Sequence, residues 1–160
     1  PGVAMLTPAA AKASLLATHH FHIRRIWTMS MPQAEDPGAT ILVVEDNRSA
    51  RIALEAILDA LGYHVLMTAS AREALALFQA QADQVDLVMS DLIMPEISGP
   101  QLCTQLRAQK SGLPVIIMSG YPLEDERAQL EAHNIRYWIQ KPFSMHQLEA
   151  MIQRALRADA

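Results

Sequence analysis

Residues 85–95 read Val85-Asp86-Leu87-Val88-Met89-Ser90-Asp91-Leu92-Ile93-Met94-Pro95. The first half is a short apolar run of strand length, typical of a parallel sheet that is covered on both faces. Pro95, Ser98 and Gly99 follow, so the strand opens into a loop soon after Asp91. Open α/β sheets bind their ligands at the carboxyl ends of strands, where this carboxylate is expected to lie. An ordinary turn residue is the alternative interpretation, since Asp is common in turns.

The composition is that of a globular protein, and 160 residues are enough to bury a core. The formal net charge is −4, so the chain does not have the excess of basic residues that is typical of a nucleic-acid-binding protein. The single Cys103 excludes an internal disulfide and fits a reducing compartment. No apolar run approaches the ~20 residues of a membrane helix. We therefore expect a cytoplasmic protein whose segment neither enters a membrane nor binds nucleic acid directly.

Residues 1–38 differ from the rest of the chain and predict an N-terminal tail or linker before a domain at 39–160. His19, His20 and His22 lie close together in this stretch, with no acidic or Cys partner nearby. A solvated linker is therefore favoured over a metal site.

A regular alternation of strands and helices begins near Thr40. Strands are expected at 41–44, 64–67, 85–90, 113–118 and 135–140, and helices at 48–61, 71–82, 99–109, 123–133 and 144–157. Ser70 and Glu73 have the spacing of a capping box. Five strands alternating with five helices predict an α/β fold, a flavodoxin-like, doubly wound, five-stranded parallel sheet with strand order 2-1-3-4-5.

That strand order brings three carboxylates to one edge of the sheet, because Glu45 and Asp46 follow the first strand and Asp91 ends the third. Carboxylates packed together repel, and a hard divalent cation such as Mg²⁺ keeps them ionised. Ser119 adds a hydroxyl at the end of the fourth strand and Lys141 a cation at the end of the fifth. Each residue alone could be a cap or a turn residue, but together they indicate a phosphoryl-transfer site.

Four segments resemble the signature of response-regulator receiver domains, and the match spans residues 40–157. The segments are Val44-Glu45-Asp46-Asn47, Asp91-Leu92-Ile93-Met94-Pro95 with Gly99, Met118-Ser119-Gly120-Tyr121, and Lys141-Pro142-Phe143. The runs 119–123 and 138–143 look most like the receivers of hybrid histidine kinases. The resemblance implies that residues 39–160 form a receiver domain of a two-component phosphorelay.

The resemblance also implies a role for each acidic residue. Asp91 would be the phosphoacceptor, which takes a phosphoryl group from phosphohistidine on a histidine kinase or a histidine phosphotransfer protein. Asp46, Asp91 and the backbone carbonyl of Ile93 would hold Mg²⁺, and Glu45 would act mainly through a bound water.

Further residues of the resemblance concern the bound phosphoryl group and the response to it. Lys141 would pair with the phosphoryl group or with Asp91, and its bond to Pro142 would be cis. Ser119 would hydrogen-bond a phosphoryl oxygen and, together with Trp138, switch the face formed by the fourth and fifth strands. Trp138 stands where the family usually has Tyr or Phe.

Two other functions fit the sequence less well. A phosphohydrolase with an aspartyl nucleophile usually carries a second Asp two positions on, where this chain has Ile93, so a turnover enzyme is not expected. A flavodoxin-like cofactor binder needs a phosphate loop after the first strand, where Glu45 and Asp46 would repel phosphate. The sequence does not identify the stimulus or the output, and it leaves open whether the chain forms a homodimer.

Overall fold

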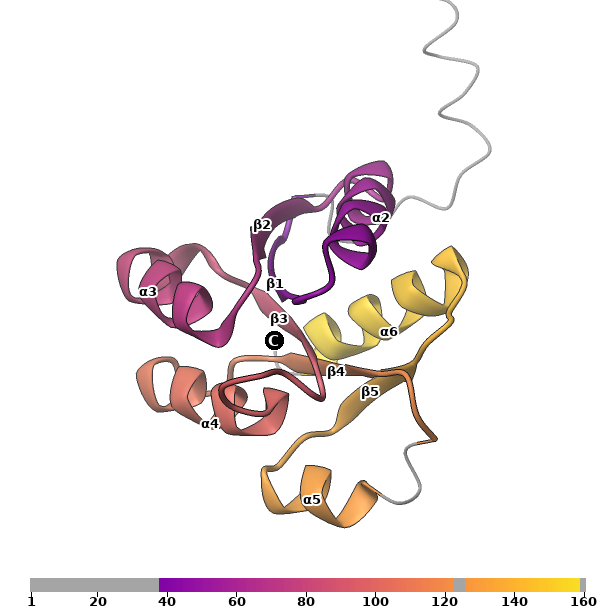
Figure 1. Ribbon diagram of the computed structural model, residues 1–160. Helices are drawn as coiled ribbons and strands as arrows, with labels where there is room; N and C mark the ends of the chain where they lie inside the picture. The colour runs from indigo at the N-terminus through magenta and orange to yellow at the C-terminus, as the bar shows by residue number, and fades with distance from the viewer. Residues whose placement is uncertain (1–37, 123–125, 159–160) are drawn as a thin grey trace, which may run out of the picture. The chain divides into compact units, whose positions relative to one another are not determined.

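The computed structural model describes residues 38–122 and 126–158 (Figure 1). The predicted tail lies outside these residues except for Gly38, and so do His19, His20 and His22. The start of the helix predicted at 123–133 lies outside them as well.

Five parallel strands form one sheet in the order β2-β1-β3-β4-β5, which confirms the predicted order. The strands are β1 (Thr40–Val44), β2 (His64–Thr68), β3 (Leu87–Asp91), β4 (Val115–Ser119) and β5 (Tyr137–Gln140). β1 and β3 are neighbours although β2 comes between them in the chain, so the strand order reverses between β1 and β3.

Within the described residues, α-helices alternate with these strands as predicted. They are α2 (Arg48–Ala60), α3 (Ala71–Gln81), α4 (Gly99–Gln109), α5 (Arg127–Ala132) and α6 (Met145–Ala158), with a short 3₁₀ helix η1 (Ala82–Gln84) after α3. None of these helices combines the length and the hydropathy that a bilayer crossing requires.

The core has two layers because successive strand residues point to opposite faces of the sheet. In Figure 1, α2 and α6 cover one face, and α3, α4 and α5 cover the other. Leu42 and Val44 of β1 pack in the second layer, with Phe78 of α3 and Leu106 of α4. Ile41 and Val43 pack in the first layer, with side chains of α2 and α6 such as Leu58 and Ile152. Burial of β1 and β3 on both faces explains their continuous apolar runs.

Three strands begin two residues later than predicted, and the hydrogen bonds explain why. The backbone N–H of Val85 donates to the carbonyl of Ala82, so Val85 closes η1 and does not enter β3. Pro114 has no N–H to donate to a sheet, and β4 begins after it. The N–H of Ile135 donates to the carbonyl of Leu130 and closes the end of α5 before β5 begins.

The capping of α3 and the start of α5 also differ from the prediction, whereas α3 begins at Ala71 as predicted. Ser70 accepts from the N–H of Glu73 as expected, but the Glu73 carboxylate accepts from the N–H of Ala69, so the box is displaced by one residue. α5 begins at Arg127, after a turn at Glu126 that supplies no side-chain cap. A complete reciprocal pair that was not predicted joins Ser144 and Gln147 before α6.

Candidate functional site

Glu45, Asp46 and Asp91 meet where β1 and β3 end. The register pairs Val44 with Ser90, so the next residue of each strand, Glu45 or Asp91, lies at the same edge of the sheet. Carboxylate oxygens of the three residues all lie within 4.8 Å of one another. Glu45 is buried, Asp91 is partly buried and Asp46 is exposed, so the cluster opens to solvent on the Asp46 side. The predicted convergence of the three carboxylates is present.

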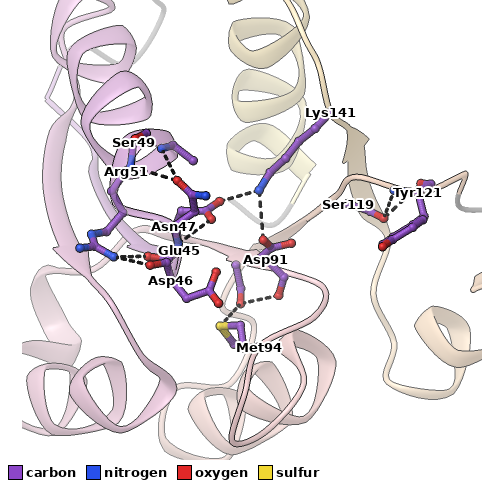
Figure 2. A network of polar contacts seen from close by, with 12 residues as sticks. Glu45, Asp46, Asn47, Ser49, Arg51, Asp91, Met94, Ser119, Tyr121 and Lys141 are labelled. Carbon is purple, nitrogen blue, oxygen red and sulfur yellow. Dashed lines mark hydrogen bonds and ion pairs between the residues drawn. The ribbon is translucent and has the colours of Figure 1, made fainter.

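Lys141 enters the cluster from the end of β5. Its backbone N–H donates to the carbonyl of Ser119 at 2.7 Å, which fixes the main chain beside β4. Its ammonium nitrogen lies 2.5 Å from Glu45 Oε2 and 3.1 Å from Asp91 Oδ2 (Figure 2). Burial disfavours the charged ammonium, but the hydrogen bonds and charges of Glu45 and Asp91 outweigh it and raise the pKa of Lys141. The bond from Lys141 to Pro142 is cis, as the family resemblance implies.

Ser119 is buried at the end of β4, and its hydroxyl is occupied locally. It donates to the carbonyl oxygen of Tyr121 at 3.1 Å and accepts from the Tyr121 N–H at 3.0 Å (Figure 2). Ser119 nevertheless lines the same cavity as the carboxylates, which has a volume of about 410 Å³. The hydroxyl is therefore beside the cluster and bonded to its own loop.

Two large apolar side chains stand at the mouth of this cavity. Ile93 follows β3 and Tyr121 follows β4, and they are 60% and 65% exposed. Both line the cavity together with Asp91 and Lys141. An isoleucine and a tyrosine therefore border the cavity that holds Asp91.

Trp138 lies apart from the carboxylates. It does not line the cavity that holds them, and its partly buried ring packs against the core layer that contains α3, α4 and α5. The guanidinium of Arg127 lies 6.0 Å from the ring centroid. The predicted site residues thus form one cluster around Asp91, and Trp138 is a separate position on β5.

Two residues that the sequence analysis did not single out for the site hold the loop between β1 and α2. The Asn47 side chain accepts from the N–H groups of Ser49 and Ala50 and so caps α2. An Asn just before a helix is a recognisable cap, so the sequence carried that signal. Arg51 donates to two carbonyls of the loop, and no local pattern in the sequence marks that role.

The chemistry of the donors fits Mg²⁺. Three carboxylates and backbone carbonyls of the adjoining loops are hard oxygen ligands, which this ion prefers. Lys141 supplies one positive charge against the three negative charges, so the cluster retains a net negative charge. Within the described residues the Asp46 carboxylate has no hydrogen bond or ion pair, so it is available to a cation.

Comparison with known proteins identifies the same family that the sequence motifs resemble, across most of the chain. The family model described as "Response regulator receiver domain" matches residues 41–153. "Sensor kinase CckA" of Brucella abortus (strain 2308) is 36% identical over 119 residues, which cover 74% of this chain and 13% of that protein. The chain spans half or less of the length of the curated relatives compared.

Solved structures agree with this comparison. The receiver domain of hybrid histidine kinase CckA is 32% identical with a TM-score of 0.62, over 74% of this chain and 99% of that one. The response regulator TrrA of Thermotoga maritima, solved in complex with Mg²⁺-BeF, is 28% identical with a TM-score of 0.66, over 74% and 99% of the two chains.

Proposed function

Because the chain belongs to the response regulator receiver domain family, we propose that it accepts a phosphoryl group on Asp91 in a two-component phosphorelay. The single observation that carries this proposal is the pairing of Lys141 with Asp91 and Glu45 inside the three-carboxylate cluster. We place the receiver domain at residues 39–160, which include the matched residues 41–153.

The proposed reaction is a transfer from phosphohistidine. An Asp91 carboxylate oxygen attacks phosphorus, the P–N bond to imidazole breaks, and a P–O bond to Asp91 forms. The imidazole leaves with the electron pair of the broken bond and takes up a proton. Lys141, already 3.1 Å from Asp91, offsets the negative charge that the phosphoryl oxygens bring to the site. Such a transfer depends chiefly on positioning and on charge stabilisation.

We propose that Asp46, Asp91 and the backbone carbonyl of Ile93 hold Mg²⁺, with Glu45 acting mainly through a bound water. When bound, the ion supplies positive charge to the transferring phosphoryl oxygens. The structure of TrrA solved with Mg²⁺-BeF supports this assignment for a similar fold. The cluster of carboxylate oxygens within 4.8 Å supports it for this chain.

The response to phosphorylation is proposed to begin at Ser119. Its hydroxyl now donates to the carbonyl of Tyr121, and a phosphoryl oxygen on Asp91 would be a stronger, charged acceptor. Exchange of that partner would move the end of β4 and the neighbouring β5, which carries Trp138. The strand 4 and strand 5 face is the proposed switch.

A phosphoacceptor is favoured over an aspartyl phosphohydrolase. Ile93 lines the cavity two residues after Asp91, where a hydrolase of that kind would need an acid or base. We therefore propose a signalling domain that catalyses only its own phosphorylation and dephosphorylation. A histidine kinase or a histidine phosphotransfer protein is the proposed partner, and the single thiol of Cys103 favours a cytoplasmic setting.

Mass measurement tests the phosphoacceptor directly. With acetyl phosphate or phosphoramidate and Mg²⁺, the wild-type chain should gain one phosphoryl group, and EDTA should suppress the gain. Asp91→Asn should gain none, whereas Asp83→Asn, which alters an exposed acid outside the cluster, should label like wild type. Equal labelling of Asp91→Asn, or undiminished labelling in EDTA, would refute the assignment.

A further inference from the structure

Arg51 folds back from α2 onto the loop that carries Glu45 and Asp46. One of its guanidinium nitrogens, Nη1, donates to the carbonyl oxygen of Glu45 at 2.8 Å and to that of Asp46 at 3.0 Å (Figure 2). The side chain is partly buried. A single donor group therefore holds two successive peptide units of the acidic loop.

The position of this cation needs a local explanation. Arg51 lies in the first turns of α2, and its guanidinium reaches residues that precede the helix. The amino end of a helix carries partial positive charge, which disfavours a cation there. The two carbonyl bonds offset that cost, because hydrogen bonds from charged donors are the stronger class.

Arg51 and Lys141 hold the loop through different atoms. Lys141 binds the carboxylate of Glu45, whereas Arg51 binds main-chain carbonyls. Within the described residues, neither cation occupies the Asp46 carboxylate. Arg51 can therefore orient the peptide units on either side of the Asp46 α carbon without taking up the carboxylate that a metal ion needs.

We propose that Arg51 is a positioning residue for the cation site, which sets the direction of the Asp46 and Glu45 carboxylates by clamping their main chain. This inference rests on the proposed function, since it assumes that Mg²⁺ binds at these carboxylates. Groups that orient metal ligands without touching the ion typically change metal affinity by roughly 10–100-fold when they are removed.

The sign of the effect separates positioning from simple charge. If Arg51 acted only as a nearby positive charge, its neutralisation would tighten the binding of a divalent cation, because repulsion would fall. If Arg51 positions the ligands, neutralisation should weaken the binding. The two accounts thus predict opposite changes for the same variant.

The test is a Mn²⁺ titration of the full chain, followed by the electron paramagnetic resonance of free Mn²⁺, with Mg²⁺ as the competitor. Arg51→Met and Arg51→Gln should bind roughly 10-fold more weakly or worse. Arg51→Lys should bind between these variants and wild type, because one ammonium has enough donors for both carbonyls on a stem one bond shorter. Circular dichroism checks that each variant is folded. If Arg51→Met is unfolded, the Mn²⁺ affinity of Arg51→Gln decides the test.

Two controls complete the test. Arg48→Met removes an exposed charge from the first turn of the same helix and should leave Mn²⁺ affinity unchanged or slightly higher. Asp46→Asn reports binding elsewhere, including any by His19, His20 and His22. If Asp46→Asn binds as tightly as wild type, the proposed metal site itself fails. If binding needs Asp46 but the neutral Arg51 variants bind as well as or better than wild type, only the role of Arg51 is overturned.

Discussion

Gly99 lies against the main chain of Asp91, so close that a Cβ atom at Gly99 would stand 2.2 Å from the Asp91 carbonyl oxygen. The N–H of Gly99 also donates to the carbonyl of Leu92 at 3.0 Å, which ties the start of α4 to the end of β3. The neighbouring atom is backbone, so the contact cannot be relieved by rotation of a side chain. Absence of a side chain at Gly99 thus allows α4 to begin directly beside the proposed phosphoacceptor.

Gly99→Ala should therefore disturb both stability and phosphorylation. Overpacking against backbone typically costs about 1–3 kcal/mol in unfolding free energy, and the Asp91 loop must shift to accept the methyl group. We expect a lower urea midpoint and slower labelling by acetyl phosphate. Gly120→Ala is the matched control, since a Cβ there meets nothing within 4 Å, and its urea midpoint should stay close to wild type. Equal midpoints for the two variants would contradict the steric argument.

Lys141→Met should destabilise the chain because it leaves Glu45 with a buried charge that has lost its cation. The Glu45 side chain is 2% exposed and that of Lys141 is 27% exposed. The Asn47 N–H still donates to Glu45 Oε1 at 3.2 Å, but loss of the cation beside a buried carboxylate typically costs about 1–3 kcal/mol or more. In urea unfolding with EDTA at neutral pH, Glu45→Gln in the same chain should recover part of the loss, because no charge then remains buried. Additive effects of the two substitutions would show that Glu45 and Lys141 are not coupled.

Cys103 should make the folded state less stable at alkaline pH. Burial raises the pKa of its thiol from 9.0 to about 12, so the folded chain keeps a proton that the unfolded chain loses near pH 9. The contribution to stability is complete below pH 9 and falls between pH 9 and 12 by about 1.4 kcal/mol per pH unit. The unfolding free energy of Cys103→Ala should decline less steeply than that of wild type between pH 8 and 10.5. If the unfolding free energies of the two proteins decline in parallel with pH, burial does not raise the pKa of the Cys103 thiol.

Trp138 should report occupation of Asp91. Its ring is partly buried against the core layer of α3 and α4, with the Arg127 guanidinium 6.0 Å away, so movement of β5 would change its surroundings. In a Trp27→Phe background, beryllofluoride with Mg²⁺ should alter Trp138 fluorescence, and Asp91→Asn should abolish the change. An unaltered spectrum at saturating ligand would place the switch elsewhere in the domain.

The phosphoryl group on Asp91 should be lost slowly. Hydrolysis needs a water in line with phosphorus, and the side chains at the cavity mouth are Ile93, which cannot form a hydrogen bond, and the bulky Tyr121. Lack of a water-orienting group typically costs about 10²-fold or less in rate. The double substitution Ile93→Asn with Tyr121→Glu should shorten the lifetime, measured by loss of phosphoryl mass after the donor is removed. A wild-type lifetime of seconds that the double substitution leaves unchanged or lengthens would exclude control by these positions.

Local patterns in the sequence were sufficient for the order of elements and for the place of the carboxylates. Ser98, Gly99 and Pro100 mark the start of α4, whose observed bounds match the predicted ones. The strand order follows from alternation and handedness, and it brings Asp91 beside Glu45 without any knowledge of side-chain contacts. These features depend on hydrophobic periodicity and turn residues, which act over a few neighbouring positions.

The tertiary structure decided which partner each polar side chain takes. Lys141 binds Glu45 as well as Asp91 across sequence separations of 96 and 50 residues. The Glu73 carboxylate accepts from the N–H of Ala69 and not from that of Ser70. Arg51 donates to the carbonyls of Glu45 and Asp46, which precede its own helix in the chain. A long side chain has many rotamers, and the choice among them depends on donors, acceptors and burial that exist only after distant strands and loops have come together.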